Sequence, residues 1–409
     1  MMLNQFEKLI SGIGAKLAEP GGVTPRRRFA LELANLGKRL YDGEHPVAWC
    51  GVVAPFDLLG AMGYTSCFVE FIGASLASSG LVGAFLQRAE QDGLVPDMCA
   101  YHRAVAGAAA ARMMPVPEVL VATTCPCTAG QATMENLART MKRALIVLHV
   151  PQEDTPESVA YLVDQLQGMV TRIEGLTGRA LDTDALARTI ERSNEAVAVM
   201  DEVYTLAANV PSPTSSRELK DFGIVMPLIL GRPEAIEVAE VYRDTFQRRV
   251  AAGTGNGVAE ERVRLLWIQN RIQFKEPLVR ELEEDLGAII VVDELNNVTW
   301  DPIDPRDPLP GIARRMITNS FNGPIEARLK KLQDLARKYK VHGAINPCNW
   351  GCRQGAGARG MMRKGLGDVG VPVLNLEVDC VDPRSFSEGQ LRTRLEAFVE
   401  MLEAKSSPN

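Results

Sequence analysis

Eight cysteines fall in two groups toward the ends of the chain. Five lie before residue 128, three lie after residue 347, and none lies between. Two groups are tight, namely Cys125-Pro126-Cys127 and the segment from Cys348 to Cys352. Buried inert thiols would not be expected to avoid the middle half of a sequence, so we expect two distant segments to meet around one soft-ligand site. An iron–sulfur cluster is the leading candidate, because thiolates hold such clusters.

Zinc and disulfides are weaker alternatives. Structural zinc sites usually combine two ligand pairs of the C-x₂₋₄-C type, and only Cys348/Cys352 has such a gap, whereas Cys125 and Cys127 are too close. The C-x₂-C-x₂-C-x₃-C run of small ferredoxins is absent, so dispersed segments must supply the ligands. The chain begins with a mixed segment rather than an apolar one, which indicates a reducing, cytoplasmic setting without disulfides.

Composition excludes several classes of partner. A chain of 409 residues with 46% hydrophobic residues is long and apolar enough for two or three domains with real cores. The net charge of −6 and the interspersed lysines and arginines give no basic surface, so nucleic acid is not an expected partner. No apolar run approaches the length of about 18 residues that crosses a bilayer, so no membrane association is expected.

The pattern of short apolar runs alternating with helical ones predicts how these cysteines are positioned. Such alternation is typical of parallel sheets with crossover helices. We therefore expect an α/β fold of two doubly wound parallel-sheet domains, Rossmann- or flavodoxin-like. A helical N-terminal arm (1–45) precedes the first α/β domain (46–154), and a helical insert (155–260) separates it from the second (261–409).

The cysteines lie where such sheets bind ligands. The two tight groups each follow a predicted strand, residues 118–123 and 341–346, and therefore lie at carboxyl ends of parallel strands. Cys99 opens an alanine-rich segment, so its thiolate would lie at the positive end of a helix. The sequence thus predicts that segments of both domains converge on one cleft. The lone Cys380 is expected to be a buried, inert thiol, and Cys50 and Cys67 are as compatible with that interpretation as with a ligand role.

Other motifs with a mechanism are absent or weak. The chain has no G-x-x-x-x-G-K-[ST] phosphate loop, and its four histidines have neither the spacing of an H-E-x-x-H helix nor a Ser-His-Asp arrangement. Glu70 and Glu294 are the carboxylates expected near strand ends, where a positioned acid or base is useful. Ordinary surface or helix-start carboxylates are the alternative interpretation of both.

Several segments resemble the 2-hydroxyacyl-CoA dehydratase and benzoyl-CoA reductase family. They are residues 55–63, 97–103, 349–354 and 370–379, together with the C-terminal stretch from 382 to 398. The resemblance implies two α/β domains and a 4Fe-4S cluster held by one cysteine from each of three segments, which by position are Cys99, Cys125 and Cys352. It also implies an open fourth iron site that substrate can approach.

The resemblance carries expectations about partners and reaction. It implies an acyl-CoA substrate, a homologous second subunit or a homodimer, and an ATP-hydrolysing iron–sulfur activator that injects one electron at low potential. In the dehydratases the electron makes a ketyl radical at the thioester carbonyl and the hydroxyl leaves, whereas in the reductases the aromatic ring is reduced.

The extra cysteines depart from the family's pattern. Cys127 and Cys348 add thiols to the second and fourth segments, where the family commonly has one cysteine. In position, Cys50 and Cys67 resemble further cysteines of a branch that carries a double-cubane 8Fe-9S cluster and reduces small molecules. Two alternatives therefore stay open: a double-cubane reductase, and a non-catalytic scaffold that binds a cluster or a partner.

Overall fold

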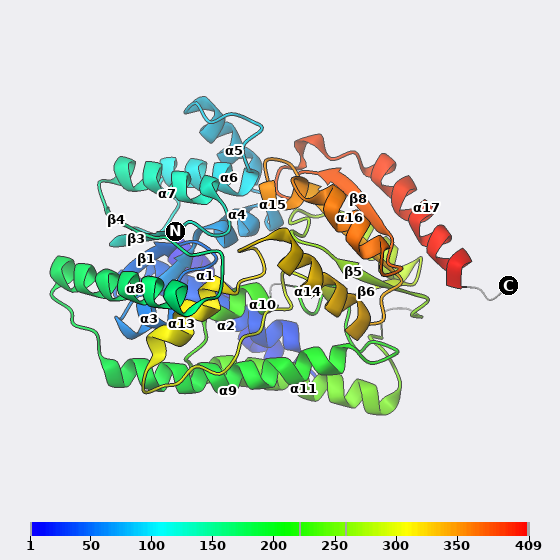
Figure 1. Ribbon diagram of the computed structural model, residues 1–409, viewed down its shortest axis with the longest axis horizontal. Coiled ribbons are helices and arrows are strands. Elements are labelled where there is room, and N and C mark those ends of the chain that lie inside the picture. The colour runs from blue at the N-terminus through cyan, green and yellow to red at the C-terminus, as the bar shows by residue number, and fades with distance from the viewer. Residues whose placement is uncertain (1, 221, 258–259, 407–409) are drawn as a thin grey trace.

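The computed structural model describes residues 2–220, 222–257 and 260–406. Two parallel four-stranded sheets form its frame, in the strand orders β2-β1-β3-β4 and β6-β5-β7-β8 (Figure 1). This arrangement confirms the predicted α/β class with two doubly wound sheets. The strands are β1 (Val47–Cys50), β2 (Thr65–Phe68), β3 (Val119–Thr123), β4 (Ala144–Leu148), β5 (Val263–Trp267), β6 (Ala288–Asp293), β7 (Gly343–Asn349) and β8 (Val373–Val378).

The first sheet is apolar on both faces because helices cover both. Alternate residues of its strands enter two cores: Trp49 and Leu120 face α6 and α7, whereas Cys50 and Val121 face the opposite core. Burial on both faces is what parallel strands with crossover helices require. The helices of this half are α3 (Phe56–Ala61), α4 (Val69–Ser78), α5 (Val82–Gln91), α6 (Ala100–Ala110) and α7 (Thr128–Met141).

The second sheet repeats this plan. Leu265 and Ile345 enter a core shared with α12 and α17, whereas Leu266 and Ala344 enter the core that also contains residues of α14 and α16. The helices of this half are α12 (Leu278–Glu284), α13 (Pro308–Ile317), α14 (Ile325–Lys338), α15 (Arg353–Ala356), α16 (Arg359–Gly367) and α17 (Glu388–Ser406).

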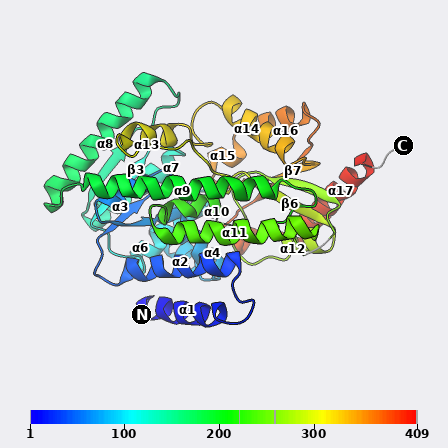
Figure 2. The same cartoon turned by 90° about the horizontal axis from the view of Figure 1, so that it is seen from below.

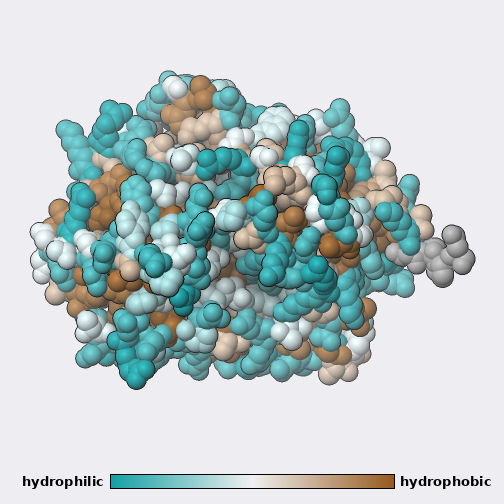
Figure 3. All heavy atoms as spheres, viewed as in Figure 1, coloured by the Kyte–Doolittle hydropathy of each residue, from teal (hydrophilic) through white to brown (hydrophobic). Residues whose placement is uncertain are grey.

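The remaining helices lie along one side of the molecule. In Figure 2, α9 and α11 run side by side, α2 lies next to α11, and α1 lies outermost on α2. Their bounds are α1 (Met2–Leu17), α2 (Pro25–Tyr41), α8 (Pro156–Thr177), α9 (Thr183–Ala207), α10 (Phe222–Val225) and α11 (Pro233–Ala252). Hydrophilic residues cover most of the face in Figure 3, with hydrophobic residues in small groups. Within the described ranges, no helix is both long and apolar enough to span a bilayer.

Two elements differ from the expectations. The short strand β2 was not anticipated, because Thr65 and Ser66 interrupt the apolar signal of a buried strand. The proline-rich stretch 301–310, expected to be a loop, contains the start of α13 at Pro308. Proline is well suited to the first turn of a helix, because the amide hydrogen that it lacks would have no partner there. Helix α13 then contacts α8 and α9, so it joins the first half of the molecule.

Candidate active site

A cavity of about 200 Å³ lies where loops from the two sheets meet. Its walls come from both halves of the chain, including the starts of α4, α6 and α7 and the loops after β5 and β7. Apolar side chains such as Phe68, Phe71, Ile224 and Leu295 form much of the lining. A concave, mostly apolar site with a few convergent polar groups is the usual form of a ligand pocket.

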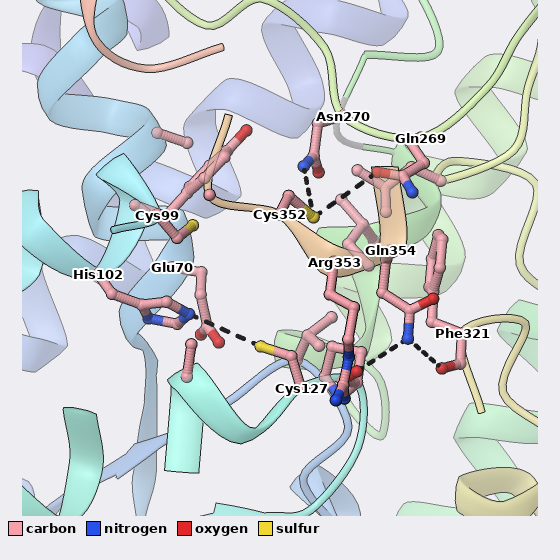
Figure 4. Close-up of a pocket in the computed structure, with 18 of the residues that line it drawn as sticks. Glu70, Cys99, His102, Cys127, Gln269, Asn270, Phe321, Cys352, Arg353 and Gln354 are labelled. Atoms are coloured by element: carbon pink, nitrogen blue, oxygen red, sulfur yellow. Dashed lines mark hydrogen bonds between the residues drawn. The ribbon is translucent and has the colours of Figure 1, made fainter. Parts of the chain in front are cut away.

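Three cysteine thiols line this cavity. They belong to Cys99, Cys127 and Cys352, and Figure 4 shows their sulfur atoms around the same space. Each residue is the N-cap of a helix, of α6, α7 and α15 respectively. The predicted convergence of three segments is therefore present in the structure, and two of the three cysteines carried over from the family, Cys99 and Cys352, take part in it.

The remaining cysteines do not line the cavity. Cys125 is 4% exposed and its side chain joins the hydrophobic core that contains Val53 and Val121. Cys348 lies in β7, where its thiol donates to the Asn375 side chain at 3.6 Å. Cys50, Cys67 and Cys380 are completely buried. The second segment thus presents Cys127 rather than Cys125 to the cavity.

A glycine lets the two halves approach closely here. Gly351 adopts a φ of +68°, and a Cβ atom at this position would lie 2.5 Å from the Cys99 amide nitrogen and 2.7 Å from the Asp97 carbonyl oxygen. Both the backbone conformation and the contact therefore require a residue without a side chain. This close approach sets Cys352 against the loop that carries Cys99.

Backbone amides distinguish the three cavity thiols from Cys125. Burial raises the pKa of Cys99, Cys127 and Cys352, while hydrogen bonds from two backbone N–H groups of the following helix act on each to lower it. For Cys127 one of these bonds, from the Gly130 N–H, measures 3.4 Å. Burial, followed by the nearby Cys127, raises the pKa of Cys125 without any such hydrogen bond. Hydrogen bonds to sulfur are a principal means by which proteins tune iron–sulfur clusters.

The donor set fits a polynuclear metal centre better than a single ion. Buried thiols of raised pKa need an adjacent cation to exist as thiolates, and a metal centre supplies it. Tetrahedral zinc with bonds of about 2.3 Å draws its sulfur atoms to within about 4 Å of one another. Among the described residues only Asp42, Glu44 and His45 bring three potential ligand atoms within 4.8 Å, so the three thiols are spaced more widely than one ion requires.

Glu70 and His102 lie between the thiols. A Cβ atom at Gly130 would contact both side chains, at 3.4 Å for His102 Cε1 and 3.7 Å for Glu70 Oε1. His102 Nε2 lies 4.0 Å from Cys127 Sγ (Figure 4). Burial raises the pKa of Glu70 to about 7 and lowers that of His102 to about 4. The expected position of Glu70 near the site holds, and at neutral pH it can carry a proton while His102 stays neutral.

Replacing Glu70 by glutamine should change how stability depends on pH in the cluster-free protein. Because the folded pKa lies above the unfolded one, the buried carboxyl costs nothing when protonated, below about pH 4.5, and the penalty grows up to about pH 7. A shift of this size corresponds to up to about 3 kcal/mol. Glu70→Gln should therefore gain this much relative to wild type between pH 4 and pH 8 in urea unfolding. A constant difference across that range would contradict the burial of an ionisable Glu70.

Glu294 occupies a different position from the one expected. It does not line the cavity; Arg328 binds both of its oxygens, at 2.7 Å and 2.8 Å, and its Oε2 accepts the Gln269 N–H at 3.0 Å. Gln269 has a positive φ of 65° and its side-chain oxygen lies 3.9 Å from Cys352 Sγ. Glu294 thus holds the loop that contacts a cavity thiol. Gln269 and its neighbour Asn270 carry no sequence signal that would have identified them beforehand.

Comparison with known proteins agrees with this site. A family model described as 2-hydroxyglutaryl-CoA dehydratase, D-component, matches residues 51–402. The (R)-phenyllactyl-CoA dehydratase alpha subunit of Clostridium sporogenes is 24% identical over 92% of this chain and 92% of its own length. A benzoyl-CoA reductase subunit of Thauera aromatica is 26% identical over 80% of this chain and 81% of its own. The resemblance expected from the sequence is thereby confirmed, and the chain belongs to the 2-hydroxyglutaryl-CoA dehydratase D-component family.

Proposed function

We propose that this chain is the iron–sulfur subunit of an acyl-CoA dehydratase or aryl-CoA reductase, with its cluster held by Cys99, Cys127 and Cys352. The observation that carries the proposal is the convergence of these three thiols, each at a helix N-terminus, on one apolar cavity. A 4Fe-4S cluster with three thiolate ligands would keep one iron open toward the cavity. When bound, such a cluster supplies a single electron at low potential.

The chain's own residues would prepare the substrate for this electron. Phe68, Phe71 and Leu295 wall the cavity with apolar surface, which excludes water from a reactive thioester. Glu70 Oε2 is buried without a hydrogen-bond partner among the described residues and can hold a proton for a departing hydroxyl or for a reduced ring. Neutral His102 beside it keeps its Nδ1 equally unpartnered and can relay or orient that proton.

The other cysteines favour a single cubane over the double-cubane alternative. Cys50 and Cys67 are buried within adjacent strands of the first sheet, and Cys125 and Cys348 are turned away from the cavity. These four thiols therefore do not extend the ligand set as the chain is folded. A 4Fe-4S cluster gives about four irons per chain, whereas about eight would favour the double-cubane branch.

Partners follow from the relatives and from the missing phosphate loop. Both matched relatives are named as single subunits of larger enzymes, which supports a second subunit for this chain as well. Because the sequence contains no Walker-type motif, an ATP-hydrolysing activator would have to deliver the electron from outside.

The reaction can be tested by product analysis. The full chain, reconstituted anaerobically with its second subunit and reduced chemically, is given a 2-hydroxyacyl-CoA or benzoyl-CoA. Loss of one water from the hydroxyacyl thioester identifies a dehydratase, and gain of two hydrogens by the aromatic thioester identifies a reductase. Cluster-free protein serves as the control. If the loaded protein transforms neither thioester, the proposed function is wrong.

A further inference from the structure

A second, smaller cavity adjoins the one that the three thiols line. It has a volume of about 60 Å³ and shares Val52, Ile224 and Phe321 with the larger cavity. This volume is several times what one water molecule requires, and it matches a carboxylate or a phosphate group in size. The residues that line it come from α3, α13 and α14 and the loops around them.

The polar lining of this second cavity consists mainly of hydrogen-bond donors. Lys331 Nζ donates to Ser320 Oγ at 2.5 Å, and no other hydrogen bond of this ammonium is present among the described residues. An ammonium has three N–H donors, so two remain for a ligand. The indole Nε1 of Trp300 is buried and has no partner in the part of the chain that the structure describes.

Arg315 adds a second cation to the same wall. Its guanidinium carbon lies 4.9 Å from the centre of the Trp300 ring, and its Nη2 lies 2.5 Å from Asp57 Oδ2. Its Nη1 is nevertheless buried without a hydrogen-bond partner among the described residues. Asp57 is shared, because it also accepts a hydrogen bond from Ser193 Oγ at 2.7 Å.

The charges around this cavity do not cancel. Asp57 offsets Arg315, and the nearby carboxylate Glu294 is bound on both oxygens by Arg328. The ammonium of Lys331 therefore lacks an anion of its own, although burial lowers its pKa. A desolvated ammonium of this kind is stabilised by an anionic ligand that accepts its free N–H groups.

We propose that this second cavity is an anion subsite, in which Lys331, Arg315 and the Trp300 indole bind an oxyanion of the substrate. The inference rests on the proposed function, since it takes the substrate to be a CoA thioester whose reacting end lies in the adjoining cavity. Two parts of such a molecule carry the required chemistry: a carboxylate at the far end of the acyl chain, and a phosphate of the carrier. Phe321, on the wall common to both cavities, would lie beside the link between the two groups.

Ligand binding by the cluster-free full chain tests this proposal. Glutarate represents the acyl carboxylate and adenosine 3′,5′-bisphosphate represents the carrier, and dissociation constants follow from the rise of Tm with ligand concentration. Lys331→Met should weaken binding ~10–100-fold, because a charge-assisted hydrogen bond is lost. Lys331→Arg should retain most of the affinity. Lys330→Met, at an exposed position on the same helix, is the matched control and should bind like wild type.

Each result decides a specific point. Stabilisation by glutarate assigns the subsite to the acyl end, and stabilisation by the bisphosphate assigns it to the carrier. If neither ligand raises Tm, or if Lys331→Met binds as tightly as Lys330→Met, the anion subsite is wrong. Because the experiment uses protein without a cluster, a failure here leaves the three-thiol site untouched, and a failure of iron binding leaves this result unaffected.

Discussion

An Arg328→Met variant is expected to lose about 3–5 kcal/mol of unfolding free energy, because it leaves a buried carboxylate without its partner. Arg328 is 4% exposed and makes two hydrogen bonds to Glu294 and a third, of 2.8 Å, to the Gln354 carbonyl oxygen. Its guanidinium also lies 4.9 Å from the centre of the Phe321 ring. The loss is measured by urea unfolding of the cluster-free protein at neutral pH.

A control on the same helix isolates the effect of burial. Arg337 pairs with Asp334 at 2.8 Å, but both side chains are about 60% exposed. Arg337→Met should therefore change the free energy of unfolding by less than about 1 kcal/mol. Combining Arg328→Met with Glu294→Leu should recover much of the stability, since no unpaired charge remains. Equal effects of the two arginine substitutions would contradict the structural role given to this pair.

Much of the frame was predictable because burial on both faces leaves a clear pattern. The expected strand 288–293 coincides with β6, and the expected strand after residue 372 is β8. In the C-terminal helix, the four residues expected on one face are all buried: Leu391, Leu395, Phe398 and Leu402. Apolar periodicity predicts such elements well, since burial of that face is what stabilises them.

The site was only partly predictable, because side-chain direction and long-range pairing leave no local signal. Cys125 and Cys127 flank one proline, and nothing in their spacing shows which thiol reaches the cavity. Glu294 was expected at a strand end, and it does follow β6 directly. Its role is fixed by Arg328, a residue 34 positions further along a different element, and that pairing exists only in the folded chain.

Loss of one thiol from the second segment is the other large effect expected. Cys127→Ser should remove most of the iron, because a serine hydroxyl is a poor substitute for a thiolate in a cluster. Cys125→Ser should keep the iron and cost only about 1–3 kcal/mol, because it places a hydroxyl in an apolar core. The two substitutions are chemically identical and lie two residues apart, so each serves as the control for the other.

Iron content of these two variants, measured side by side after anaerobic reconstitution and desalting, tests the central claim most directly. If Cys99, Cys127 and Cys352 hold the cluster, Cys125→Ser retains about four irons per chain and Cys127→Ser falls below about one. The opposite outcome, iron lost with Cys125 and kept without Cys127, would contradict the ligand set and the cavity as the site of the cluster.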